Sequence, residues 1–240
     1  MQHSQSVPEF PQEKRKEPHL PRKVAYEDLW NAAKTAKIST VNDPLNRYIF
    51  EHRSNNKWLD LLDRIIIVLA WTKFPAMRTG WTVDAGDALM LYDDPAKATP
   101  PLWYKLVLRV VTVFSRLVRS PEQRRRGREF ESKITAAIKE TLGDRAKDMF
   151  NLAHLATSPA KQGRGYGTAV CKALTTEADE RKLASYVVSS NVKGNTPFYN
   201  YLGYYTVAEI LLGEDDPSWK EPPVPIALMV RELPSVDSKV

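Results

Sequence analysis

Residues 155–168 constrain the fold more than any other segment of this chain. They contain the end of an apolar run, three glycines in five positions and the start of an amphipathic pattern. The apolar run predicts a buried strand that ends near Thr157. Beyond the glycines, apolar residues recur at steps of three and four as far as about Lys182, which predicts a helix. The chain must therefore form a strand, a tight turn and a helix in direct succession.

The three glycines, Gly163, Gly165 and Gly167, predict a turn that binds an anion. Without side chains, the backbone can approach a ligand closely and direct its free N–H groups toward one point. The start of the following helix adds about half a positive charge there. The segment matches neither G-x-G-x-x-G nor the G-K-[ST] ending of the Walker loop. We therefore expect a pyrophosphate to be held by a different kind of loop.

Two motifs resemble the signatures of the GNAT N-acetyltransferase superfamily. Residues 162–167, Gln-Gly-Arg-Gly-Tyr-Gly, are similar to the [QR]-x-x-G-x-[GA] signature, in which backbone amides hold the pyrophosphate of acetyl-CoA. Residues 195–204, Asn-Thr-Pro-Phe-Tyr-Asn-Tyr-Leu-Gly-Tyr, resemble the second signature, N-x-x-(F/L)-Y-x-x-x-G-(F/Y). The segment from Trp219 to Glu232 looks like a branch of the family that is common in fungi. The resemblance covers residues 20–232.

The resemblance implies an α+β fold with a central, mostly antiparallel sheet and helices on both faces. Two central parallel strands, expected at residues 151–157 and 186–190, would splay into a V that holds the arm of acetyl-CoA. Residues 20–232 would form the acetyltransferase domain, with a helical insertion at about 100–142. Composition predicts flexible tails at residues 1–19 and 233–240.

The resemblance also implies the residues of the site. The residues expected to bind acetyl-CoA through its phosphates, pantetheine amides and arm are Leu155, Ala156, Thr157, Gln162, Gly163, Arg164, Gly165, Tyr166, Gly167, Thr168, Asn191, Asn195 and Phe198. Tyr199 lies four residues before Gly203, at the position of the family's tyrosine. We expect its hydroxyl to protonate the departing CoA thiolate, and a purely structural core aromatic is the alternative.

No residue is assigned as the base that removes a proton from the acceptor. An alkylamine with a pKa of about 10.4 is only about one part in 2,500 neutral near pH 7. Some family members carry a glutamate or histidine on the strand before the glycine turn, but the corresponding inward positions here are Asn151 and Ala153. Strand alternation places His154 on the opposite face unless a bulge resets the phase, so we interpret it as a hydrogen-bonded structural histidine. Cys171 has no histidine at helical spacing and is not expected to act as a nucleophile.

These features predict an acetyl-CoA-dependent N-acetyltransferase that acetylates a primary amine of a small molecule, amino acid or peptide by direct attack. Two alternatives stay open. The missing base suggests a catalytically silent CoA-binding regulatory module, and the positive charge suggests a protein- or histone-type acetyltransferase. The net charge is +6, but it lies in short clusters, so nucleic acid is not the favoured partner.

The remaining features concern partners and location. Arg124, Arg125, Arg126 and Arg128 are interpreted as a solvated helix start. Four scattered histidines and one cysteine show no metal-ligand spacing, so no metal is expected. The first residues lack the apolar core of a signal peptide. We expect a cytoplasmic monomer or homodimer without a transmembrane segment, and a nuclear location stays open.

Residues 100–119 predict an unusual helix. Its polar stripe consists of Lys105, Arg109, Thr112, Arg116 and Arg119, and the rest of its surface is apolar. Packing inside the protein is the favoured interpretation. Insertion of residues 102–119 into a membrane interface is the alternative.

Periodicity and turn residues predict the other elements. Helices are expected from Tyr26, from Pro44 behind an Asp43 cap, over residues 58–71 and 130–142, and from Asn195. Strands are expected at residues 20–25, 81–83, 88–92, 204–212 and 224–231.

Overall fold

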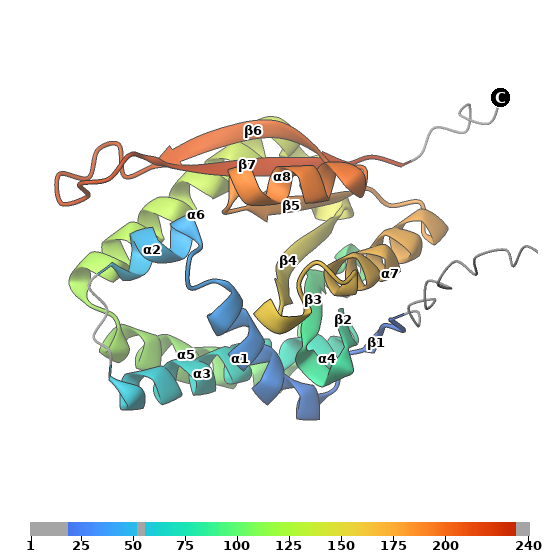
Figure 1. The fold of residues 1–240 in the computed structure, drawn as a ribbon, viewed down its shortest axis with the longest axis horizontal. Coiled ribbons are helices and arrows are strands. Elements are labelled where there is room, and N and C mark those ends of the chain that lie inside the picture. The colour runs from blue at the N-terminus through green and yellow to red at the C-terminus, as the bar shows by residue number, and fades with distance from the viewer. Residues whose placement is uncertain (1–18, 52–55, 234–240) are drawn as a thin grey trace, which may run out of the picture.

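A computed structural model describes residues 19–51 and 56–233, which form one seven-stranded sheet flanked by helices (Figure 1). The strands are β1 (Arg22–Lys23), β2 (Gly80–Val83), β3 (Ala88–Asp93), β4 (Phe150–Thr157), β5 (Ser185–Ser189), β6 (Tyr205–Leu212) and β7 (Val224–Arg231). The α-helices are α1 (Leu29–Ser39), α2 (Pro44–Phe50), α3 (Lys57–Trp71), α4 (Lys73–Met77), α5 (Leu102–Val118), α6 (Pro121–Leu142), α7 (Tyr166–Glu180) and α8 (Val192–Tyr201). Short 3-10 turns are η1 (Tyr26–Asp28), η2 (Asp84–Gly86), η3 (Pro95–Lys97), η4 (Gly143–Asp148) and η5 (Pro159–Lys161).

The strand order is β1-β2-β3-β4-β5-β7-β6, and only β4 and β5 run parallel. These two strands pair at three positions, from Phe150 with Ser185 to Leu152 with Val187. Beyond this root, residues 153–157 of β4 have no partner in β5, and the two strands diverge (Figure 1). The predicted fold class, including the splay between central parallel strands, is confirmed.

Helices cover both faces of the sheet. On one face, α7 packs its apolar stripe, including Val170 and Leu174, against β2, β3 and β4, and Tyr199 of α8 joins the same core. On the other face, α1 and α3 cover β3 and β4. There, α2 and α6 cover β6 and β7 around the buried Tyr48. On this second face the two halves of the sheet, joined at the β4–β5 root, therefore have separate helical covers, whereas the α7–α8 core on the first face spans both halves (Figure 1).

Local sequence explains where most helices begin. The side chain of Asp43 accepts the Asn46 N–H at 3.1 Å, so α2 begins at Pro44 as predicted. Ser120 caps α6 at Pro121, and the helix expected over residues 130–142 is its second half. Asn191 Oδ1 accepts the Gly194 N–H at 3.1 Å, so α8 begins at Val192 and not, as expected, at Asn195. Helix α4 was not predicted.

The predicted tails lie largely outside the described residues, except for His19 and Leu233. His19 contacts the glycine turn: its Nε2 lies 2.9 Å from the Arg164 carbonyl oxygen, and its ring lies 3.9 Å from that of Tyr166. None of the helices in residues 19–51 and 56–233 is both long and apolar enough to cross a bilayer.

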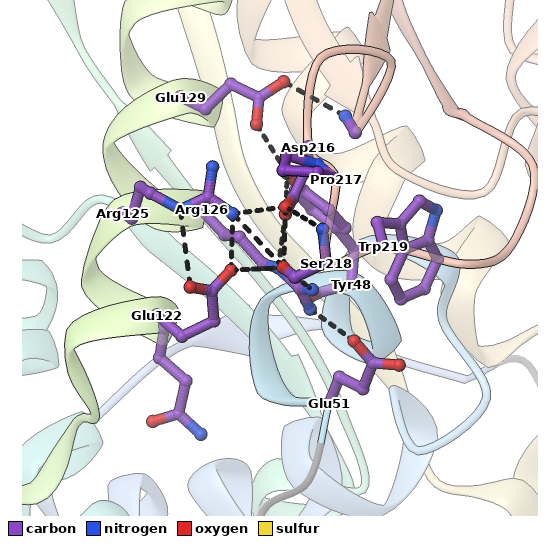
Figure 2. Close-up of polar contacts among 12 residues, drawn as sticks. Tyr48, Glu51, Glu122, Arg125, Arg126, Glu129, Asp216, Pro217, Ser218 and Trp219 are labelled. Atoms are coloured by element: carbon purple, nitrogen blue, oxygen red, sulfur yellow. Dashed lines mark hydrogen bonds and ion pairs between the residues drawn. The ribbon is translucent and has the colours of Figure 1, made fainter.

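Of the four arginines at the start of α6, only Arg126 is buried, and its interpretation as solvated is wrong; Arg124 and Arg125 are partly exposed, and Arg128 is exposed. Arg126 is 2% exposed. It donates to Asp216 Oδ2 at 2.9 Å and to Glu51 Oε2 at 2.7 Å (Figure 2). Arg125 also pairs with Asp216, and the Tyr48 carbonyl accepts from Arg126 at 2.7 Å. Since a broken buried ion pair costs about 3–5 kcal/mol, this network holds α2, α6 and the β6–β7 loop together.

Candidate active site

The splay between β4 and β5 opens into a cleft of about 610 Å³. One wall is β4 from Leu152 onward, and the opposite wall is the end of β5 with the first turns of α8. The glycine turn closes one end, and the connection between α1 and α2 borders the cleft as well. The cleft therefore lies where the sheet lacks strand pairing.

Nearly all the site residues predicted from the sequence line this cleft. They are Leu155, Ala156, Thr157, Gln162, Gly163, Gly165, Tyr166, Gly167, Thr168, Asn191, Asn195, Phe198 and Tyr199. Arg164 does not line it: the residue is exposed on the turn, and its carbonyl contacts His19. The structure thus brings the two motifs to opposite sides of one opening.

The glycine turn presents a row of unused amides. Gly163 and Gly165 have φ angles of 69° and 87°, a left-handed conformation that glycine adopts without strain. The first bond of α7 is from Ala169 N–H to the Gly165 carbonyl at 2.9 Å. Among the described residues, no acceptor lies on the N–H groups of residues 163–168. The backbone here is therefore a ready-made anion site.

Contacts on either side hold the turn in place. The Ser158 N–H donates to the Asp87 carbonyl at 2.7 Å, and Gln162 Nε2 donates to the Thr157 carbonyl at 3.1 Å. The Tyr166 hydroxyl donates to Asp84 at 2.7 Å. A Cβ on Gly167 would lie 3.2 Å from Thr157 Oγ1, so the helix start packs tightly against β4. The amides are thus oriented before any ligand arrives.

Tyr199 is buried beside the cleft, with 4% of its surface exposed. Its ring packs between those of Phe198 and Tyr204, at centroid distances of 5.3 and 5.8 Å. In the described part of the chain its hydroxyl has no hydrogen-bond partner. Burial raises the pKa of this hydroxyl above its ordinary value, so it stays protonated through the neutral range. A protonated donor without a partner therefore borders the cleft.

A β-bulge in β4 decides where His154 lies. Tyr92 of β3 pairs with Leu152, and the adjacent Leu91 pairs with His154, so Ala153 is an extra residue. The bulge resets the alternation and puts His154 on the same face as Asn151. The sequence analysis stated that a bulge would move His154 to this face, but it did not expect such a bulge.

The interpretation of His154 as a hydrogen-bonded structural histidine is wrong, because no hydrogen-bond partner lies on its ring in the described chain. The ring lies 5.1 Å from that of Trp71 and lines both the cleft and a second cavity. Although the ring is accessible from these cavities, the surrounding protein displaces much of its hydration and lowers its pKa to about 4. Nearby Asp93 opposes this shift, and Lys73 adds to it. The imidazole is therefore neutral near pH 7.

The second cavity has a volume of about 740 Å³ and shares Thr40 and His154 with the cleft. Its apolar lining residues are Ala36, Val41, Phe50, Ile66, Ile67, Trp71 and Trp219. Several charged lining groups neutralise one another, since Lys37 pairs with Asp60 and Arg47 pairs with Glu221. A molecule in this cavity could reach the cleft past the His154 ring.

Ser189 is a lining residue that the sequence reasoning missed. It is 2% exposed, and its Oγ has no hydrogen-bond partner among the described residues. Ser189 lines the cleft from the end of β5, and Tyr199 lines it from α8. No sequence pattern marks such a serine, because its hydroxyl lacks a partner only as a result of the splay between β4 and β5. A buried hydroxyl without a partner costs free energy unless a ligand bonds to it.

Two other chemistries receive no support from the site. Cys171 is buried on α7, and burial raises the pKa of its thiol, so the nucleophilic thiolate is disfavoured. In the parts of the chain that the structure describes, no group of three or more His, Cys, Asp or Glu side chains is placed to hold a metal ion.

Comparison with known proteins identifies the domain. Residues 90–204 match the sequence model of the acetyltransferase (GNAT) family. A structure described as histone acetyltransferase HPA2 and related acetyltransferase from Corynebacterium glutamicum is similar, with 17% identity, a TM-score of 0.55, and coverage of 90% of this chain and 97% of that one. A mosquito arylalkylamine N-acetyltransferase like 5b has 14% identity, a TM-score of 0.52, and coverage of 89% and 99%.

An N-acetyltransferase from Staphylococcus aureus has 15% identity, a TM-score of 0.50, and coverage of 88% of this chain and 99% of that one. At these identities the likeness concerns the fold. A comparison with curated protein sequences gave no match. The two motifs, the splayed sheet and the family match agree: residues 90–204 belong to a domain of the GNAT acetyltransferase family.

Proposed function

We propose that this protein is an acetyl-CoA-dependent N-acetyltransferase that acetylates the primary amine of a small molecule by direct attack. One observation carries the proposal: the free amides of residues 163–168, the unpaired edge of β4 and the Tyr199 hydroxyl border the same cleft. Phosphates, amides and a thioester are the successive parts of acetyl-CoA. The unused groups of the cleft match these parts in kind.

The binding half of the proposal rests on backbone donors. A hydrogen bond to a charged oxygen contributes roughly 1.5–3 kcal/mol, so several amides of residues 163–168 can hold a pyrophosphate. Residues 154–157 pair with β3 on one side and leave their other edge unpaired. The pantetheine amides can bond to this edge as an added strand would, which agrees with the roles predicted for Leu155, Ala156 and Thr157. Ser189 Oγ provides a further group facing the arm.

In the chemical step, the amine nitrogen attacks the thioester carbon, the carbon–sulfur bond breaks, and the CoA thiolate leaves. Tyr199 acts as the acid. Because burial keeps its hydroxyl protonated, it can donate to the sulfur as negative charge develops there. An acyl-enzyme is not required, since no activated nucleophile lies among the described lining residues of the cleft.

His154 is the group we propose to take the proton from the amine. It is neutral above a pH of about 4, it has a free ring nitrogen, and it lies where the two cavities meet. A base this weak removes the proton only after attack has made the nitrogen acidic, and it then passes the proton to water. The missing base was the reason for considering a silent CoA-binding module, and His154 weakens that reason.

The second cavity is the proposed acceptor site. Its volume of about 740 Å³ lies within the usual range for small-molecule pockets, and its wall combines apolar and aromatic side chains with paired charges. We therefore propose an amine with a largely apolar body. The acceptors in the names of the similar structures do not support this choice, because those likenesses concern the fold alone.

The proposal is tested by incubating the protein with acetyl-CoA and a panel of small amines, amino acids and peptides while free thiol is measured. Thiol release with a small amine is expected. The variant Gly165→Asp, which fills the anion site with a negative side chain, provides the control and should show little release. Acetyl-CoA binding without release for any acceptor would favour the regulatory module, and release only with peptides would favour a protein acetyltransferase.

A further inference from the structure

Helix α5 exposes an apolar face that no described residue covers. Its inner face, which includes Tyr104 and Val111, packs against α3, and the Tyr104 hydroxyl donates to the Ala70 carbonyl at 2.5 Å. This contact agrees with the packing expected from the sequence. The packing accounts for only part of the apolar surface of the helix, however.

Most exposed apolar residues of α5 gather on one side of the helix. At about 100° per residue, seven of them fall within an arc of about 120° opposite and beside the inner face, and only Leu108 lies outside it. The seven are Leu102, Trp103, Leu106, Val110, Val113, Phe114 and Leu117, with exposed fractions between 38% and 78%. Helix α3, which packs against α5, adds exposed Trp58, Leu61 and Ile65 at helical spacing. An exposed apolar surface of this size marks an interaction site.

The charges on α5 have one sign. No acidic residue occurs between Asp94 and Glu122. Lys105, Arg109 and Arg116 form a stripe along the edge of the apolar arc, and in the described chain none of the three side chains has an ion-pair partner. Cations beside exposed leucine, tryptophan and phenylalanine are the composition of helices that lie in a membrane interface.

We propose that α5 docks this protein on the surface of an anionic phospholipid bilayer, with the helix lying in the plane of the interface. The apolar arc would enter the boundary between headgroups and acyl chains, and the basic stripe would contact the headgroup phosphates. A second copy of this chain fits the charges less well. A symmetric contact through α5 would bring a second basic stripe and no acid from that helix to neutralise the first.

The test uses flotation of the full chain with phosphatidylcholine vesicles that contain or lack phosphatidylserine. Binding is expected only with phosphatidylserine, and added salt should weaken it. The single variants Leu106→Asn and Leu117→Asn should each lower the partition coefficient by about tenfold, because a buried leucine side chain is lost from the interface. Lys105→Gln, Arg109→Gln and Arg116→Gln should each lower it by about fivefold.

The matched control is Leu20→Asn. Leu20 is 80% exposed, against 76% for Leu117, but it lies outside α5 and α3. This variant should bind vesicles as the parent does, and circular dichroism should show that all variants are folded. The proposal is overturned if the parent ignores anionic vesicles, binds neutral ones equally, or is unaffected by the α5 substitutions. It is also overturned if α5 substitutions convert a dimer into monomers and the parent shows no vesicle binding, since a second copy then covers the face.

Discussion

Replacing Ser189 with alanine should move stability and ligand affinity in opposite directions. The Ser189 hydroxyl is buried, has no partner in the described chain and lines the cleft. An unsatisfied buried polar group costs about 1–3 kcal/mol, and alanine has nearly the same shape without the oxygen. Ser189→Ala should therefore raise the free energy of unfolding of the ligand-free protein by about 1 kcal/mol or more. For a chain of this length, that corresponds to a rise in Tm of about 2–4 °C.

The same substitution should weaken acetyl-CoA binding. If the bound arm bonds to Ser189 Oγ, that neutral hydrogen bond contributes about 0.5–1.5 kcal/mol, and its loss raises the Kd by about twofold to tenfold. Thermal unfolding without ligand measures the first effect, and isothermal titration with acetyl-CoA measures the second. Neither measurement requires the acceptor to be known.

Ser185 provides a matched control on the same face of β5. It is fully buried as well, but its Oγ lies 2.8 Å from the Tyr204 hydroxyl. Ser185→Ala removes a satisfied bond, so it should lower the Tm and leave the Kd for acetyl-CoA unchanged. The reasoning fails if Ser189→Ala lowers the Tm as Ser185→Ala does, or if it binds acetyl-CoA as tightly as the parent.

Three further predictions concern the proposed chemistry. Tyr199→Phe should lower kcat by roughly tenfold to ten-thousandfold with an unchanged Kd for acetyl-CoA, and equal turnover when chemistry limits the rate would exclude Tyr199 as the acid. Gly165→Asp should raise the Kd for acetyl-CoA, measured by titration, because a side chain and a negative charge occupy the anion site; unchanged affinity would remove the turn from the binding site. His154→Gln should lower kcat. Because the loss of hydration beside the surrounding protein lowers the pKa of His154 to about 4, from an ordinary value of about 6.5, the unfolded chain takes up a proton first as the pH falls, and stability is lost between these values. The Tm of His154→Gln should thus fall less than that of the parent between about pH 7 and pH 5. An equal fall in both proteins would contradict the lowered pKa of His154.

Much of the fold and of the proposed binding residues could be predicted because their signals are local. Glycines before a periodic helix specify the turn, and Asp43 before Pro44 specifies a helix start. Most of the predicted site residues consequently line one cleft, although their binding roles stay predictions. The placement of Tyr199 beside that cleft follows from a motif of the same local kind.

The features that were missed depend on partners distant in the sequence. Ala153 becomes an extra residue only through the register of β4 with β3, and this register decides the position of His154. Arg126 is buried because Glu51 and Asp216 converge on it from other elements, and no local pattern records that convergence (Figure 2). The outer face of α5 also matches the pattern of a buried helix, because periodicity alone does not show whether a partner exists.

The connection between α1 and α2 has a mechanical consequence for the cleft. Helix α1 belongs to one half of the sheet and α2 to the other, so residues 40–43 tether the halves away from the β4–β5 root. The tether is slack: the Asp43 N–H donates to the Thr40 carbonyl at 3.0 Å, and Asp43 also accepts from Ser190 at 2.7 Å. Four extended residues span at most about 14 Å. Widening the cleft about the three paired residues of the root would therefore straighten this tether and also separate the α7 and α8 side chains that share one core across both halves.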